Sequence, residues 1–149
     1  MEIAALEQYL HHQIPLSAAM KVTVSGATLE SIILAAPLKP NINHKSTAFG
    51  GSLSTLGILA AWSLVHLRLL DEGENCEVVI QSNQMEYDKP VTGSFIARSA
   101  LTSPATWPVF VNTLRRRKLA RVEVNSQLIF EGDVVGRLTG RFVAFLQKP

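Results

Sequence analysis

The sequence has little cysteine, little net charge and no cluster of metal ligands, and each shortage excludes a class of protein. Cys76 is the one cysteine, so no intrachain disulfide can form, and a reducing compartment such as the cytoplasm is favoured. The 14 basic and 12 acidic residues leave a net charge of +2, too small for the basic surface of a nucleic-acid-binding protein. No spacing of His, Cys, Asp and Glu predicts a metal site.

Apolar residues are abundant: they make up 47% of the 149 residues, whereas charged residues make up 17%, and the mean hydropathy is +0.19. This composition excludes intrinsic disorder, and the length favours a single domain over residues 1–149. The N-terminal residues lack the basic and then apolar order of a signal peptide. The positive mean hydropathy predicts either one very apolar segment or a large surface buried against a partner.

The very apolar segment runs from Leu53 to Leu70 and is long enough to cross a membrane. His66 and Arg68 lie within it, and amphipathic strands are expected on both sides of it. A helix that is apolar on nearly every side is either a membrane span or the centre of a domain. The neighbouring strands favour the second interpretation, a helix buried against a sheet.

The rest of the chain predicts a short helix over 2–12 and then mainly strands, with a loop at Pro104–Pro108 in which Trp107 packs. Residues 118–125 and 128–138 are expected to pair across Ser126–Gln127, and the type of 109–114 stays open. The other expected strands are 20–25, 28–36, 77–87, 91–101 and 141–146. These elements predict an α+β fold, in which a curled antiparallel sheet surrounds one long central helix. Its edge strands favour dimerisation.

The stretch most typical of a functional site is 40–56, where a polar loop and the pair Gly50–Gly51 precede the long helix. Glycine lets a ligand approach the backbone closely, and the first N–H groups of a helix have no intrahelical acceptor. These donors can hold a carbonyl oxygen that becomes an oxyanion during acyl transfer. The alternative is a glycine pair that only allows tight packing between helix and sheet.

Two segments resemble signatures of the hot-dog-fold thioesterase superfamily. Residues 41–53, NINHKSTAFGGSL, are similar to its loop before the central helix, and Tyr87–Val91, YDKPV, is similar to its junction between the next two strands. The order of elements is similar from Leu16 to Leu146. Within the superfamily, the chain most resembles the thioesterase domain that also occurs fused behind GNAT-type acetyltransferases.

The resemblance implies a hot-dog fold, a dimer as the minimal unit and acyl sites at the dimer interface. The implied substrates are thioesters of coenzyme A or acyl-carrier protein, with coenzyme A as part of the substrate and no separate cofactor. By this resemblance, the backbone N–H of Gly51 or Ser52 polarises the thioester carbonyl. Asn43, His44 or Thr47 then holds the attacking water or the thioester from the loop.

The sequence departs from many members of that superfamily in its acidic residues. No Asp or Glu occurs between Ser46 and Leu70, and Ile58 stands where a catalytic carboxylate often lies. Phe49 replaces the histidine of a His-Gly-Gly version of the motif. Hydrolysis then requires a different base or a water oriented by neutral groups. Suitable neutral groups are those of Asn43, Ser54 and Thr55.

Charged residues outside the helix each allow two interpretations. His44 is either a base near neutral pH or an exposed loop residue. The run Arg115, Arg116 and Arg117, followed by Lys118, either binds the phosphates of coenzyme A or an acidic carrier protein, or forms a solvated turn. Glu86 and Asp88 either reach the site from a partner subunit or belong to a solvated strand face.

Two further residues are interpreted as structural. Cys76, at the expected start of a strand, is a structural residue, with a catalytic thiol as the alternative. His66, far along the helix from the glycine pair, is expected to be a hydrogen-bonded packing residue.

We therefore expect thioester hydrolysis, in which a water attacks a carbonyl held at the N-terminus of the central helix. A non-catalytic acyl-thioester binder is one alternative, because the helix carboxylate is missing. A structural oligomerisation domain is another. A dehydratase is disfavoured, because it requires a His and a carboxylate across the site.

Overall fold

The computed structural model describes residues 2–146, which form six strands, four α-helices and one short 3-10 helix. In chain order the elements are α1 (Ile3–Gln13), α2 (Pro15–Ala19), β1 (Thr23–Ala27), β2 (Ile32–Ala36), η1 (Lys39–Asn41), α3 (Gly50–Asp71), β3 (Cys76–Tyr87), β4 (Phe95–Leu101), α4 (Thr106–Arg117), β5 (Leu119–Phe130) and β6 (Asp133–Leu146).

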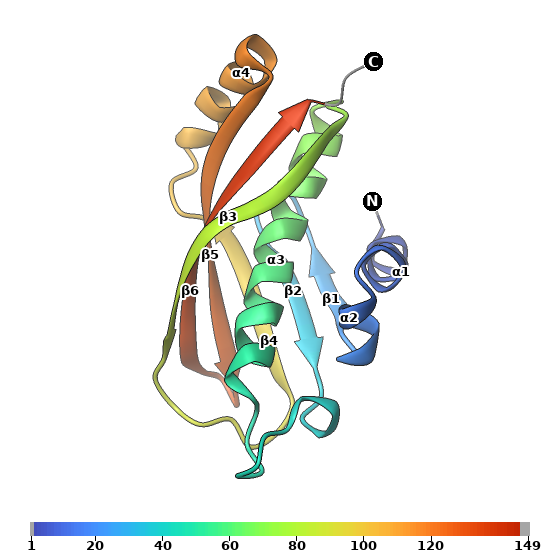
Figure 1. Cartoon of the computed structure of the whole chain (residues 1–149), viewed down its shortest axis with the longest axis vertical. Helices are drawn as coiled ribbons and strands as arrows, with labels where there is room; N and C mark the ends of the chain where they lie inside the picture. The colour runs from blue at the N-terminus through green and yellow to red at the C-terminus, as the bar shows by residue number, and fades with distance from the viewer. Residues whose placement is uncertain (1, 147–149) are drawn as a thin grey trace.

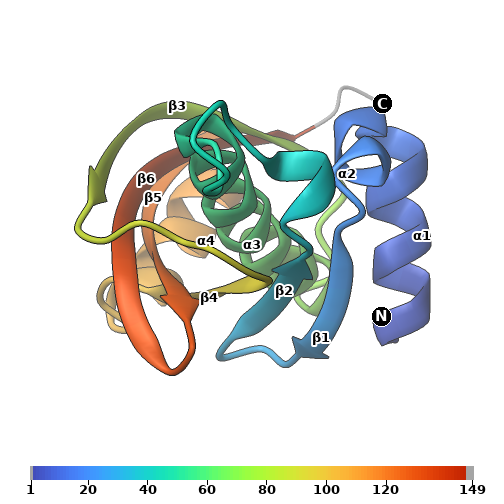
Figure 2. The ribbon, with the colours of Figure 1, turned by 90° about the horizontal axis from the view of Figure 1, so that it is seen from below.

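All six strands belong to one antiparallel sheet with the order β1-β2-β4-β5-β6-β3. Figure 1 shows α3 lying along this sheet, with α4 near the end where α3 finishes. Seen along α3 in Figure 2, the sheet curls around the helix, and α1 lies beside β1. The predicted α+β fold, a curled sheet around one central helix, is confirmed.

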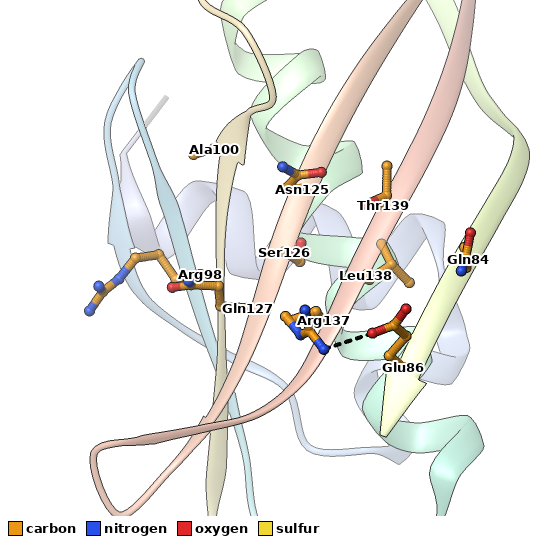
Figure 3. A pocket seen from close by; sticks show the side chains of 10 residues that line it. All are labelled: Gln84, Glu86, Arg98, Ala100, Asn125, Ser126, Gln127, Arg137, Leu138 and Thr139. Carbon is orange, nitrogen blue, oxygen red and sulfur yellow. Dashed lines mark hydrogen bonds and ion pairs between the residues drawn. The ribbon is translucent and has the colours of Figure 1, made fainter. Parts of the chain in front are cut away.

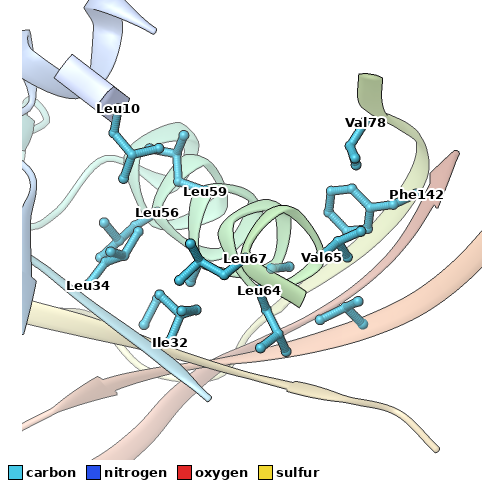
Figure 4. Close-up of a cluster of buried hydrophobic side chains, with 14 of the residues drawn as sticks. Leu10, Ile32, Leu34, Leu56, Leu59, Leu64, Val65, Leu67, Val78 and Phe142 are labelled. Carbon is cyan, nitrogen blue, oxygen red and sulfur yellow. The ribbon is translucent and has the colours of Figure 1, made fainter. Parts of the chain in front are cut away.

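The central helix α3 is buried because it is apolar on most sides and the sheet encloses it. Leu56, Ala60, Leu64 and Val65 have no exposed surface, and Figure 4 shows side chains from α1, β2, β3 and β6 gathered around the helix. Within residues 2–146, α3 is the one helix long and apolar enough to cross a membrane. Most of its apolar surface contacts the protein's own sheet, so it forms the core, as predicted.

The predicted loop at Pro104–Pro108 is wrong, because α4 begins inside it at Thr106. Pro108 is the third residue of this helix, where the N–H that proline lacks would have no intrahelical acceptor. One face of α4 packs on β5 and β6, and the expected packing of Trp107 is confirmed. The buried residues of that face, at helical spacing, are Trp107, Phe110, Val111 and Leu114.

The predicted turn at Ser126–Gln127 is also wrong, because β5 continues through it to Phe130. Ser126 is buried and its hydroxyl donates to the Gly57 carbonyl of α3 at 2.7 Å, so this polar residue faces the helix. The chain reverses instead at Glu131 and Gly132, with φ of 50° and 81°. Two positive φ angles are those of a tight hairpin turn of type I′.

The two edge strands of the sheet differ in what covers them. Side chains of α1 reach the β1 edge, where Glu7 accepts a hydrogen bond from the Val24 N–H at 2.8 Å and His11 Nε2 lies 2.6 Å from the Val22 carbonyl. The long strand β3 pairs with β6 alone. On its other side Trp62 donates to the Val78 carbonyl at 2.8 Å, and no strand within residues 2–146 pairs there.

Candidate functional site

A cavity of about 270 Å³ borders the N-terminus of α3. Its walls come from the loop before α3, the first turn of α3 and the junction between β3 and β4. The Ala48 N–H donates to the Val91 carbonyl at 2.8 Å and ties the loop to the junction. The two sequence segments that carry the resemblance therefore meet here. The lining residues are Ala48, Gly50, Leu53, Tyr87, Asp88, Lys89, Pro90 and Val91.

The glycine pair lies beneath two aromatic rings. A Cβ on Gly50 would lie 3.3 Å from Cε1 of Tyr87, and a Cβ on Gly51 would lie 2.4 Å from Cε2 of Phe49. Phe49 is 57% exposed and Tyr87 is 53% exposed, so both rings also face solvent beside the helix N-terminus. The glycines thus allow close packing, with Tyr87 at the end of β3 as one partner. They also leave the backbone between the two rings uncovered by any side chain.

The N–H groups of the first turn of α3 are not equivalent. The N–H of Ser52 and the N–H of Leu53 both donate to the Phe49 carbonyl, at 2.9 and 3.1 Å. Within residues 2–146, the N–H groups of Gly50 and Gly51 have no acceptor. Of the two donors predicted to polarise a carbonyl, Ser52 is therefore occupied and Gly51 is unoccupied.

Asn43 and Thr47 close the loop in front of α3. The side-chain Oδ1 of Asn43 accepts from the N–H of Lys45 at 2.9 Å and of Thr47 at 3.1 Å, while its Nδ2 donates to the Thr47 hydroxyl at 2.8 Å. The side-chain amide of Asn43 is therefore occupied by hydrogen bonds that stabilise the loop. His44 is exposed on it. The structure thus brings Asn43, His44 and Thr47 together in one loop, but none of them lines the 270 Å³ cavity.

The second turn of α3 presents hydroxyl groups on the side that the sheet leaves partly open. Ser54 and Thr55 are half-buried, and both follow Gly51 at helical spacing. Ile58 is half-buried one turn further on. The helix α3 has no acidic residue before Asp71. Its serine and threonine hydroxyls are therefore the polar side-chain groups nearest along the helix to the unoccupied Gly51 N–H.

Two carboxylates of the β3 end are held by one arginine. Arg137 bonds to Glu86 at 2.7 Å and to Asp88 at 3.3 Å, and these contacts, the bond to Asp88 foremost, raise the pKa of its guanidinium. Asp88 is also among the residues that line the 270 Å³ cavity. The structure therefore places one carboxylate at the helix N-terminus from the strand junction of the same chain.

The predicted phosphate-binding arginines lie at the opposite end of α3. Arg115, Arg116 and Arg117 form the last turn of α4, and Arg115 pairs with Glu72 and Glu74, just beyond the end of α3. A helix of 22 residues is about 33 Å long, so within one chain these arginines are far from Gly51. Arg116 and Arg117 are exposed there.

A second cavity, of about 310 Å³, lies between α1, α3 and the start of β3 and contains Cys76 and His66. Burial, with Glu74 and Glu77 nearby, raises the pKa of the Cys76 thiol to about 11, which fits the structural interpretation because a thiol is nucleophilic only as thiolate. His66 stacks with both Tyr9 and Trp62, whose own ring centroids lie 6.1 Å apart, so the three rings form one cluster. It packs as predicted, but its buried Nε2 has no hydrogen-bond partner within residues 2–146.

Another cavity, of about 560 Å³, lies on the sheet face turned away from α3. Figure 3 shows its polar side chains rising from β3, β4, β5 and β6, with Arg137 bonded to Glu86. Sequence reasoning missed this cavity, because neighbouring strands form it and their pairing was predicted wrongly. It also did not single out the Tyr87 side chain, although the YDKPV segment was a signal for that position.

Solved structures of other proteins share this architecture. A protein of unknown function from Chlorobaculum tepidum is 27% identical, with a TM-score of 0.90, over 97% of this chain and 94% of that one. A putative thioesterase from Shewanella oneidensis is 26% identical, with a TM-score of 0.83, over 96% of each chain. A thioesterase from Haemophilus influenzae has a TM-score of 0.79 over 98% of this chain and 92% of that one, and at 13% identity it shows the fold alone.

The family comparison covers almost the whole described chain. The model of the family YiiD_C, described as putative thioesterase (yiiD_Cterm), matches residues 3–146. This range includes the loop before α3, the glycine pair and the β3–β4 junction. The family and the thioesterase neighbours agree with the hot-dog fold described above. The chain therefore belongs to the YiiD_C family of putative thioesterases, which places it within the hot-dog-fold thioesterase superfamily.

Proposed function

We propose that this protein hydrolyses acyl thioesters of coenzyme A or acyl-carrier protein at the N-terminus of α3. The observation that carries the proposal is the unoccupied Gly51 N–H, whose neighbour Gly50 lines an open cavity. A thioester carbonyl oxygen bound there gains charge when water attacks, and a preorganised N–H stabilises that charge. The tetrahedral intermediate then loses the thiol as the carbon–sulfur bond breaks, which leaves a carboxylic acid.

The attacking water is proposed to lie against the Ser54 and Thr55 hydroxyls, since α3 supplies no carboxylate in its first five turns. With neutral groups orienting the water, the pH dependence is distinctive. The rate should rise steadily with pH, as the hydroxide concentration does. A rate that levelled off at neutral pH would instead indicate that a titrating side chain acts as the base.

The site is proposed to be completed by a second copy of the chain, paired along the free side of β3. A two-fold axis that pairs two β3 strands antiparallel also reverses α3. The Gly51 end of one protomer would then lie near the α4 end of the other. This would bring Arg116 and Arg117 of the partner subunit toward the thioester site, where their exposed guanidinium groups could bind the phosphates of coenzyme A.

An assay against acyl-CoA and acyl-carrier-protein thioesters of several chain lengths tests the proposal. Release of free thiol above the buffer rate is expected for at least one of them. Ser54→Ala should lower kcat, because it removes a hydroxyl at the site, whereas Ser94→Ala, in the exposed loop before β4, should not. The absence of turnover with every thioester would contradict the proposal.

A non-catalytic acyl-thioester binder is the second candidate, and the missing carboxylate on α3 favours it. A thioether analogue of acyl-CoA, which cannot be hydrolysed, separates the two. A binder is stabilised against heat by the analogue and by true thioesters alike, and releases no thiol from the latter. An enzyme is stabilised by the analogue and consumes the thioester. If the protein is neither stabilised by the analogue nor able to hydrolyse a thioester, a structural oligomerisation domain is the remaining interpretation.

A further inference from the structure

We propose that Tyr87 is a positioning residue for the peptide group that presents the Gly51 N–H. The inference rests on the proposed function, which assigns this N–H to the thioester carbonyl. The Tyr87 phenol donates a hydrogen bond to the Gly50 carbonyl oxygen at 3.0 Å. The Gly50 carbonyl and the Gly51 N–H are opposite ends of one planar peptide group, so a bond that fixes the carbonyl also fixes the direction of the N–H.

The same bond makes the N–H a stronger donor. A carbonyl oxygen has two lone pairs, and in the first helical residue one accepts the helix's own bond from four residues ahead. The Tyr87 hydroxyl takes the other. Hydrogen bonds in such a chain polarise one another, so charge drawn toward the Gly50 oxygen leaves the Gly51 N–H more positive. Tyr87 thus acts on the reacting carbonyl through the peptide group.

The backbone around Tyr87 holds its phenol in place before any ligand binds. Tyr87 is the last residue of β3 and pairs with Gly136 of β6. Immediately after it, the N–H groups of Asp88 and Lys89 both donate to the Val135 carbonyl, at 2.9 and 3.2 Å. Because Gly50 has no side chain, the ring can approach the helix closely enough for its hydroxyl to reach the carbonyl. The arrangement is therefore built into the sheet.

Tyr87→Phe removes the hydroxyl and keeps the ring against Gly50. Tyr9→Phe is the matched control, because Tyr9 stacks on His66 far along α3 and its hydroxyl makes no hydrogen bond within residues 2–146. For the thioester that the wild type hydrolyses fastest, we expect Tyr87→Phe to lower kcat about tenfold and to leave KM within about twofold. Tyr9→Phe should change neither.

A second measurement does not depend on activity. In ¹⁵N-labelled protein, loss of the bond to the Gly50 carbonyl should move the Gly51 amide nitrogen and proton resonances upfield in Tyr87→Phe, with no such shift in Tyr9→Phe. If the Tyr87 hydrogen bond only joined β3 to α3, its loss would lower the melting temperature and would not lower kcat selectively relative to KM.

The outcomes separate the two proposals. Unchanged Gly51 resonances in Tyr87→Phe overturn the positioning role. Shifted resonances with an unchanged kcat overturn its contribution to hydrolysis. If the wild type releases no thiol from any thioester, the proposed function fails, and the Gly51 resonances still decide whether Tyr87 polarises this peptide.

Discussion

At position 51 the backbone and the neighbouring ring cannot be changed independently. A methyl group there would lie 2.4 Å from the Phe49 ring, which must then turn away. Because that ring is already 57% exposed, turning it into solvent costs little packing. The chemical surroundings of the Gly51 N–H, however, would change on two sides, by the added methyl group and by the displaced ring.

Gly51→Ala should therefore separate activity from stability. The free energy of unfolding should change by no more than about 1 kcal/mol, because the better helix propensity of alanine offsets the lost ring contact. In contrast, kcat/KM should fall about tenfold or more, because access to an oxyanion donor is disturbed. Thermal unfolding and steady-state assays measure the two effects. Ser52→Ala is the control, since its N–H already bonds to Phe49, and an equal loss there would contradict the assignment.

Cys76 should react slowly with iodoacetamide at neutral pH. Its thiol pKa of about 11, raised by burial and by Glu74 and Glu77, keeps it protonated, and the thiolate is the reactive form. The alkylation rate of the folded protein should keep rising with pH beyond pH 9, the ordinary thiol value for this group. A plateau at or below pH 9 would show that the pKa is not raised. Cys76→Ser should hydrolyse thioesters at the wild-type rate.

The contact between α1 and α3 gives a prediction at the scale of elements. Tyr9 of α1 stacks on His66, whose ring centroid lies 4.7 Å from that of Trp62 on α3. Burial lowers the pKa of His66, so the folded protein binds a proton there less readily than the unfolded chain does. Its neutral form therefore contributes stability above pH 6.5, and this contribution is lost as pH falls through 6.5 toward the lower folded value.

His66→Phe should reduce the fall in melting temperature between pH 7.5 and pH 5.5, because phenylalanine keeps the stack and does not titrate. His12→Phe is the control, since His12 is exposed near the end of α1. Melting temperatures across this pH range test the prediction. An acid-side slope in His66→Phe equal to that of the wild type would assign the loss of stability to other groups.

Elements with a strong local pattern were predictable from the sequence, and those defined by tertiary context were not. The apolar run of α3 and the candidate strand at 77–87 had bounds within a few residues of the observed ones. In α4, two prolines obscured the apolar spacing, although Pro108 falls in the first turn, where proline is tolerated. Ser126 was taken for a turn residue because its buried bond to Gly57 is invisible in the sequence.

The same division holds for the candidate site. Gly51 could be singled out because a glycine pair precedes a long helix, and both features are local. Which N–H stays unoccupied could not be predicted, because it depends on the Phe49 carbonyl accepting bonds from Ser52 and Leu53. The Tyr87 hydroxyl could not be placed either, since 37 residues separate it from Gly50 along the chain.

For the whole molecule, the prediction concerns the free side of β3. If two copies pair there about the middle of β3, Asn83→Lys should weaken the dimer, because the two added charges would lie close together across the two-fold axis. We expect the dissociation constant to rise about tenfold or more, measured by sedimentation equilibrium, with a matching loss of activity. Thr139→Lys places the same charge on the internal strand β6, opposite the uncharged Asn125 and Gln84, and should change neither. A monomeric wild type would contradict the proposed assembly.

The rings over the glycine pair also set an order in which this site can change by single substitutions. A side chain at position 51 fits without displacing a ring only if Phe49 is already smaller, whereas one at position 50 requires the Tyr87 ring to move by a few tenths of an ångström. A double substitution such as Phe49→Ala with Gly51→Ala should therefore be less harmful than the sum of its parts, a case of positive epistasis. The first turn of α3 thus diversifies with the least disturbance of the site along paths that begin at Phe49.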